Sequence, residues 1–231
     1  MSRAFCIPGI VFLLCALVLS VIVSISLPFL PAIDFVRVKF ASGVTAATNG
    51  DAMTELRFGV WAPCYYDTHG ARTCFKAAHA YSIAISNAAK TSNATIGSSW
   101  TRGLAVHPVA AAVTFIAFIF SFSTHHAFTL FSSLLSFLAA LLTLIAFVID
   151  IVLYARVHHE VGNIADVSGH TTTSPAFWMT FASFILLLLA GCTVCFGRRR
   201  DRMSGASAYP METYNKPSFF SRFRRNKAAA Y

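Results

Sequence analysis

Four long runs of apolar residues alternate with more polar segments along this chain. The runs contain 19 to 26 residues, and a helix needs roughly 17–25 residues to cross the hydrocarbon core of a bilayer. Backbone N–H and C=O groups cannot stay unpaired in hydrocarbon, and the runs lack the strict alternation of barrel strands, so they are predicted to be helices. The expected membrane-spanning segments are residues 7–30, 104–122, 128–153 and 176–196.

The first run allows two interpretations, and it is closed by Pro28 and Pro31. Arg3 and the small residues at 24–26 fit the basic start and the cleavage pattern of a signal peptide. However, the apolar stretch is longer than the roughly 7–15 residues that a signal peptide uses. A retained first helix is therefore favoured, with a cleaved signal peptide as the alternative.

The composition supports an integral membrane protein and argues against a soluble enzyme. Of the 231 residues, 56% are hydrophobic and only 12% are charged, whereas a soluble domain carries roughly 25% charged residues. The sequence contains no Gly-rich phosphate loop, His-Glu-x-x-His or Gly-x-Ser-x-Gly motif. We expect a non-enzyme without catalytic residues, metal ligands, cofactors or a small-molecule substrate.

The positive charge of the chain lies mainly at its C-terminal end. The formal net charge is +9, and nine of the 18 basic residues follow residue 197. Basic segments beside membrane spans stay in the cytoplasm, so the tail 197–231 is predicted inside. With an even number of spans, residues 1–6 and the turn 123–127 are also inside, while residues 31–103 and 154–175 face outward.

Two interpretations of the basic tail remain open. The tail is either a solvated, disordered segment or a segment adsorbed on anionic lipid head groups through its basic and aromatic residues. Nucleic acid is not an expected partner, because no nucleic-acid recognition motif accompanies the charge.

The first outer segment carries the pattern of a small β-structure. Residues 35–40 and 56–61 are rich in β-branched and aromatic residues and are predicted strands. Residues 64–66 and 71–75 flank a turn-rich stretch, which is typical of a hairpin. Residues 86–99 are rich in Ser, Thr, Asn and Ala, and we expect a flexible approach to the second span.

Two features of the same segment fit an extracellular location. Cys64 and Cys74 flank the predicted hairpin, where an oxidising compartment would allow a disulfide between them. Two free thiols in a flexible loop are the alternative. Asn93 begins an Asn-Ala-Thr acceptor for N-glycosylation, which acts on the extracellular side.

The motif Phe58-Gly59-Val60-Trp61, followed by Cys64 and Cys74, resembles the first outer loop of claudin-like four-span proteins. It is also similar to the fungal PalI family of pH-response regulators. Trp61 stands where that family commonly has Phe, and residues 62–63 replace its Gly-Tyr. His107-Pro108, at the entry of the second span, and Asp150, near the end of the third, resemble further motifs of the same family.

This resemblance covers roughly residues 5–200. It implies an all-α transmembrane four-helix bundle with a small, disulfide-stapled extracellular β-structure of the claudin-like type. It further implies a plasma-membrane accessory component of ambient alkaline-pH signalling, whose partner is a separate multi-span pH sensor. The alternative is a claudin-like structural organiser of plasma-membrane domains beside the cell wall.

Some single residues have a plain structural interpretation beside a functional one. His107-Pro108 fits a helix start with an interfacial histidine, or else a contact to a partner helix or a titrating group. Asp150 is the only Asp, Glu, Lys or Arg within the predicted spans, which disfavours a channel or transporter. We expect Asp150 to face the bundle near the outer interface.

The remaining candidates are cysteines and histidines. Cys6, Cys192 and Cys195 fit either packing residues or juxtamembrane sites of S-palmitoylation. Exposed histidines titrate near pH 6.5 in any protein, so those on the outer side are weak candidates for pH sensors. These outer histidines are His69, His79, His158, His159 and His170.

Overall fold

A computed structural model describes residues 6–41, 44–46, 52–123, 126–165 and 167–207. The chain divides into two compact units, residues 1–197 and residues 198–231. The first unit contains the sheets and the membrane-spanning parts of the helices, and the account below concerns it.

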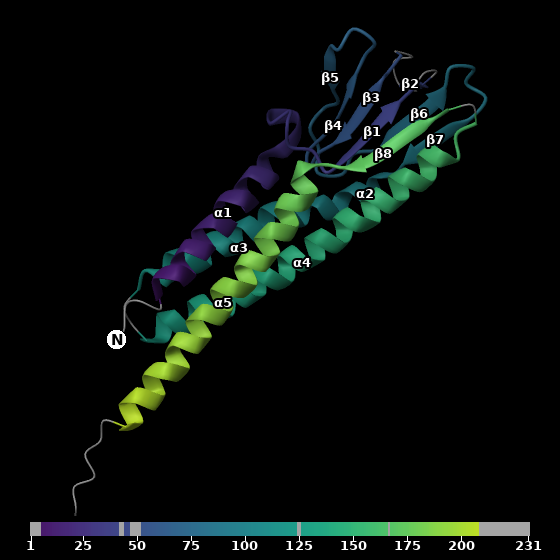
Figure 1. The fold of residues 1–231 in the computed structure, drawn as a ribbon. Helices are drawn as coiled ribbons and strands as arrows, with labels where there is room; N and C mark the ends of the chain where they lie inside the picture. The colour runs from purple at the N-terminus through teal and green to yellow at the C-terminus, as the bar shows by residue number, and fades with distance from the viewer. Residues whose placement is uncertain (1–5, 42–43, 47–51, 124–125, 166, 208–231) are drawn as a thin grey trace, which may run out of the picture. The chain divides into compact units, whose positions relative to one another are not determined.

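Four helices in the described parts of the chain are long and apolar enough to cross a membrane, which confirms the predicted number of spans. Figure 1 shows the four long helices lying side by side, with the strands gathered at one end. Short segments α2 (Ser98–Thr101) and η2 (Arg102–Ala105) lead into the second long helix. The long helices are α1 (Cys6–Phe29), α3 (Val106–Ser121), α4 (His126–Gly162) and α5 (Pro175–Ser207).

Small side chains allow the helices to approach one another inside the bundle. Helix α3 packs against both α1 and α4, and a buried cluster of mainly alanine and leucine joins all four long helices. Helix α5 meets α4 through the Phe147 ring, whose centroid lies 5.0 Å from that of Phe177 and 5.2 Å from that of Phe181. Without a hydrophobic driving force in lipid, such close packing holds the helices together.

Helix α4 extends nine residues beyond the predicted end of the third span at residue 153. Polar residues interrupt the apolar run there, but Leu153, Val157 and Val161 continue one buried face at helical spacing. This face packs beneath the strands, where α4 contacts both sheets. Part of the expected outer segment 154–175 is therefore helix.

The strands form two antiparallel sheets. One sheet has the order β5-β4-β3-β1-β8, and the other has the order β2-β6-β7. The first contains β1 (Val36–Phe40), β3 (Glu55–Phe58), β4 (Pro63–Tyr66), β5 (Arg72–Cys74) and β8 (Gly169–Thr173). The second contains β2 (Val44–Ala46), β6 (Ile83–Asn87) and β7 (Asn93–Ile96).

The central strand of the larger sheet joins the two predicted outer segments. Strand β1 pairs on one side with β3, in the register Val36 opposite Phe58. On its other side it pairs with β8, in the register Val36 opposite Thr173. Both outer segments therefore lie on the same side of the bundle, as an even number of intervening spans requires.

The predicted strand at 35–40 and the hairpin at 64–75 are confirmed, whereas the strand predicted at 56–61 is shorter, because β3 ends at Phe58 and residues 59–61 form the connection to β4. The expectation of a flexible segment at 86–99 is wrong, because β6 and β7 form a second hairpin there and α2 follows. Buried side chains alternate with exposed ones along β7, with Ala94 and Ile96 facing the core. Asn93 and Thr95 occupy the exposed face of β7, whereas Ser86 and Asn87 at the end of β6 are buried.

A single hydrophobic core connects the sheets with the ends of the helices. It contains Val23 of α1, Leu104 of η2 and Leu153 of α4 together with side chains from β1, β3 and β6. Phe35, just before β1, is completely buried in it. The outer domain is thus built onto the helix ends, and the residues singled out in the sequence meet at this boundary.

Candidate functional site: the junction between sheet and bundle

The end of α1 is bound by the Gly-Val-Trp part of the sequence motif, which directly follows β3. The helix loses its regular backbone geometry at Ser26 and Leu27. The Val60 N–H donates to Ser26 Oγ at 3.0 Å, and Trp61 Nε1 donates to the Ser24 carbonyl at 2.8 Å. A helix end leaves carbonyl groups without partners, and the Trp61 indole satisfies one of them. The motif therefore anchors the sheet to α1.

Gly59 is the point of closest approach in this anchor. A Cβ atom added to it would lie 2.9 Å from the Leu27 carbonyl oxygen and 3.0 Å from the Leu27 Cα. On the other side, the Tyr81 hydroxyl donates to the Gly59 carbonyl at 2.7 Å. Burial raises the pKa of Tyr81, so this donor keeps its proton at every ambient pH.

His107 and Asp150 form a buried pair between α3 and α4. His107 Nε2 lies 3.0 Å from Asp150 Oδ1, and the side chains are 5% and 0% exposed. Pro108 lies in the first turn of α3, where its missing N–H has no intrahelical partner. The predicted helix start is confirmed, and the His107 ring is buried against Phe35, with 4.8 Å between the ring centroids.

A small cavity with both polar and apolar side chains in its wall lies in the bundle beside this pair. Its volume is about 10 Å³, which is close to the minimum for one water molecule. All four long helices contribute to its wall, which is lined by Ser20, Val23, His107, Ala110, Thr143, Ala146, Thr180 and Ser183.

An ion-pair chain holds the start of β1. Asp34 is completely buried, and its carboxylate accepts from Arg37 Nη2 at 2.9 Å. This hydrogen bond raises the pKa of the Arg37 guanidinium. Glu55 Oε1 lies 3.2 Å from Arg37 Nε and 2.7 Å from Arg57 Nε, and the Arg57 guanidinium covers the Tyr66 ring. The charged side chains at the start of β1 and on β3 are therefore paired with one another.

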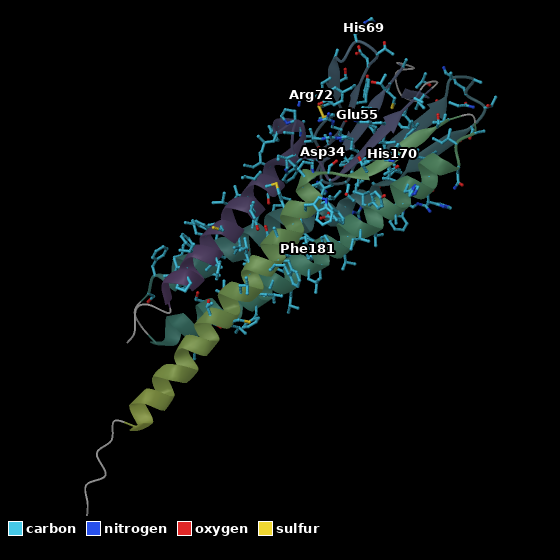
Figure 2. The ribbon with its side chains drawn as sticks, viewed as in Figure 1. Asp34, Glu55, His69, Arg72, His170 and Phe181 are labelled. Carbon is cyan, nitrogen blue, oxygen red and sulfur yellow. A yellow bond between two sulfur atoms is a disulfide. The ribbon has the colours of Figure 1, made fainter. Side chains whose placement is uncertain are left out.

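The start of α5 is tied to the same place. The Ala176 N–H donates to the Asp34 carbonyl at 3.0 Å, and the Ser174 N–H donates to the Phe35 carbonyl at 3.1 Å. Figure 2 shows Asp34 and Glu55 near the base of the sheet, while His69 lies at the far tip and Phe181 lies among the helices. Helix α3 and the start of α5 thus meet the sheet at Phe35 and Asp34, while α1 meets it at Val60 and Trp61.

Cys64 and Cys74 form the expected disulfide, and they are direct cross-strand partners on β4 and β5. Their sequence separation is 10, so the closed loop is short. Cys64 is completely buried beneath the motif. The disulfide therefore stiffens the β4–β5 hairpin, which begins two residues after Trp61.

We predict that replacing both Cys64 and Cys74 with serine lowers the free energy of unfolding by about 2 kcal/mol. The loss stays near the lower end of the usual range because the loop closed by the bond is short. Thermal unfolding of the purified protein in detergent measures it. Cys192→Ser is the matched control, because Cys192 is an unpaired, exposed cysteine on α5. Equal melting temperatures for the double variant and the control would contradict the prediction.

The other candidate residues lie apart from the junction. Asn93 is exposed on β7, and Cys192 is exposed on α5. The side chains of Cys6 and Cys195 lie outside what the structure describes. The outer histidines are all exposed, and the described residues include no group of three His, Cys, Asp or Glu side chains placed to hold a metal ion.

Several junction residues could not be identified from the sequence. Phe35 and Tyr81 gave no signal beyond their apolar or strand-like setting, and Ser24 and Ser26 resembled only a cleavage pattern. His107 and Asp150 were noted separately, and nothing in their spacing indicated a contact. Their pairing depends on how α3 packs on α4, which is a tertiary property.

Comparison with known proteins adds one finding. The family model described as SUR7/PalI family matches residues 5–191, which is most of the chain and includes every junction residue. No curated protein matches the sequence.

Proposed function

This chain belongs to the SUR7/PalI family, and from that membership we propose that it is a non-catalytic accessory component of ambient alkaline-pH signalling. In this role it lies in the plasma membrane with both termini in the cytoplasm and supports a separate multi-span pH sensor. Membrane lipids surround its four helices, and the sensor is its protein partner.

The observation that carries this proposal is the pairing of His107 with Asp150. The His-Pro motif and the aspartate are two of the features by which the chain resembles the pH-response branch of the family. They are separated by 43 residues in sequence, yet their side chains meet at 3.0 Å. The His-Pro motif and the aspartate both resemble the pH-response branch, and their side chains meet at one site. This meeting supports a role that belongs to the pH-response branch.

The packing of the bundle favours a scaffold over a transporter. The cavity between the four helices has room for about one water molecule. The sheet and the helix ends share one hydrophobic core, which presents the outer domain as a rigid surface. Such a protein acts by contact with a partner.

The claudin-like motif favours the alternative role of a structural organiser of membrane domains. Trp61 and the disulfide hairpin belong to the outer-loop pattern that this chain shares with claudin-like proteins in general. The two roles differ in what the cell loses when the chain is absent, and one experiment separates them.

The test is deletion and rescue in the organism that carries this chain. We expect deletion to lower the surface abundance of the pH sensor and to impair growth at alkaline pH. The intact chain and Cys192→Ser should restore both, whereas the double Cys64→Ser, Cys74→Ser variant should restore neither. Normal sensor abundance and normal alkaline growth would contradict the proposal, and a general cell-surface defect would support the organiser role.

A further inference from the structure

The hydrogen bonds of Asp150 leave one carboxylate oxygen without a donor. Oδ1 faces His107 Nε2 at 3.0 Å. Oδ2 is buried and has no hydrogen-bond partner among the described residues. An ionised carboxylate that is buried with an unsatisfied oxygen is costly, because it has lost its water and gained nothing in exchange.

The Thr180 hydroxyl lies beside the Asp150 carboxyl group and can hydrogen-bond to it. The same hydroxyl donates to the Ala176 carbonyl at 2.9 Å, and with a single hydrogen it cannot donate to both acceptors at once. A hydroxyl oxygen keeps lone pairs and can still accept a hydrogen bond. A proton on Asp150 Oδ2 would therefore satisfy both groups, since the acid would then donate and the hydroxyl would accept.

Most of the side chains that surround the His107–Asp150 pair are not titratable. Helix α1 presents Ser20 and Val23 to this region, α5 presents Thr180 and Ser183, and the segment before β1 presents Phe35. Charged and titratable side chains on adjoining segments are Asp34 with its partner Arg37, the exposed Arg102 of η2, Tyr154, and Arg156, which is paired with Glu160 and lies over the Trp100 ring.

We propose that the His107–Asp150 pair is a buried proton-binding site whose occupancy controls how firmly the outer sheet is held on the bundle. With its proton, the pair is neutral overall, either as two uncharged groups or as imidazolium and carboxylate. When the proton leaves for water at alkaline pH, a neutral imidazole and a carboxylate remain. One uncompensated negative charge then lies between α3 and α4.

The small cavity supplies a place for the solvent that such a site needs. It is lined by His107 and by hydroxyl groups from α1, α4 and α5, and its volume suits one water molecule. A water there would have several polar partners, as buried waters require. Through His107, which lines the cavity, such a water would adjoin the pair.

Phe35 transmits the state of the pair to the sheet. Its ring contacts the His107 ring, its N–H donates to the Phe58 carbonyl at 2.9 Å, and its carbonyl accepts from the Ser174 N–H at 3.1 Å. A shift of the imidazole on loss of the proton therefore reaches β1, β3 and the start of α5. The predicted consequence is looser attachment of β1 at alkaline pH.

This inference deepens the proposed function and rests on it for its place in alkaline-pH signalling. The chemistry of the pair is tested separately on purified protein. Normal sensor abundance after deletion would overturn the signalling role while the proton site stood. If the pair does not titrate, the proposed proton-binding site is contradicted, but the accessory role is not.

The first measurement follows the proton directly. The purified full-length chain in lipid nanodiscs, with ¹⁵N-labelled histidine, is titrated from about pH 5 to about pH 9, the range in which histidine charge normally changes. The signal lost in His107→Gln identifies His107. We expect its ring nitrogens to change over this range and their titration to shift in Asp150→Asn. A wild-type His107 signal that stays constant would overturn the proposal.

The second measurement follows the sheet. Amide hydrogen exchange of residues 35–40, corrected for its intrinsic pH dependence, should be about tenfold faster at the alkaline end in the wild type. Strand β6 serves as the internal control, and its exchange should not change. Asp150→Asn, which keeps the shape but cannot ionise, should remove the pH dependence, whereas the exposed His170→Gln should preserve it. If hydrogen exchange in β1 and β6 depends equally on pH in the wild type, the proposal is contradicted, whatever the variants show.

Discussion

Replacing Gly59 with alanine will lower the free energy of unfolding by about 3 kcal/mol, because the added methyl group overlaps the backbone of the residue on which the motif rests. The new Cβ would lie 2.9 Å from the Leu27 carbonyl oxygen and closer still to the Leu27 Cβ. Backbone atoms cannot turn aside as a flexible side chain can. The turn must therefore move away from α1.

This movement breaks contacts that do not involve the glycine side chain. The Val60 N–H would lose Ser26 Oγ, and the Trp61 indole would lose the Ser24 carbonyl, bonds of 3.0 and 2.8 Å in the wild type. Buried donors left without acceptors add to the cost of overpacking. The environment of Trp61 changes at the same time, so its fluorescence reports the displacement.

Thermal unfolding and tryptophan fluorescence of purified Gly59→Ala test this prediction. Gly97→Ala is the matched control, because a Cβ there would meet only Ser99 Oγ, at an ordinary contact distance of 3.8 Å. The control should unfold like the wild type. If both variants have wild-type stability, the close approach of Gly59 to Leu27 does not stabilise the fold.

Replacing Asp150 with leucine should lower the free energy of unfolding by about 3 kcal/mol, since it leaves the buried His107 without its partner. Helix α4 places Asp150 in the bundle, where neither lipid nor bulk water can replace the lost hydrogen bond. The double variant His107→Leu, Asp150→Leu removes both polar groups together. It should recover much of the stability, because an apolar pair carries no unsatisfied group.

A double-mutant cycle measures this coupling in detergent or lipid. The expected coupling free energy is about 1–2 kcal/mol, near the upper end of what polar pairs in membrane proteins show. Ser136→Ala is the control on α4, since its buried hydroxyl donates only to the Ser132 carbonyl one turn away. Additive effects of the two single substitutions would refute an energetic link between His107 and Asp150.

The parts of the fold that local patterns determine were predictable from the sequence. Long apolar runs are sufficient to locate membrane helices, because lipid imposes one length and one type of backbone hydrogen bonding. The alternation at 35–40 likewise indicated β1, and the turn residues at 67–70 indicated the β4–β5 hairpin. Each of these signals lies within a few residues of the element that it predicts.

The parts that depend on distant partners were not predictable. Strand β8 is a short run of His and Thr whose pairing partner, β1, lies more than a hundred residues earlier. The extension of α4 was hidden because Arg156 and the residues at 158–160 interrupt the apolar run in the sequence, although the buried face continues between them. His107 and Asp150 could each be singled out, but their contact follows from helix packing, for which a single sequence carries no pattern.

The position of β8 also has a consequence for biosynthesis. Strand β1 emerges early in synthesis, but one of its two neighbours in the sheet follows only after α3 and α4 have been made. Until then, an edge of β1 has unpaired N–H and C=O groups, which are a template for pairing with another chain. A chain whose middle helices have not been inserted therefore keeps this edge open to aggregation. Completion of the sheet thus depends on insertion of both middle helices.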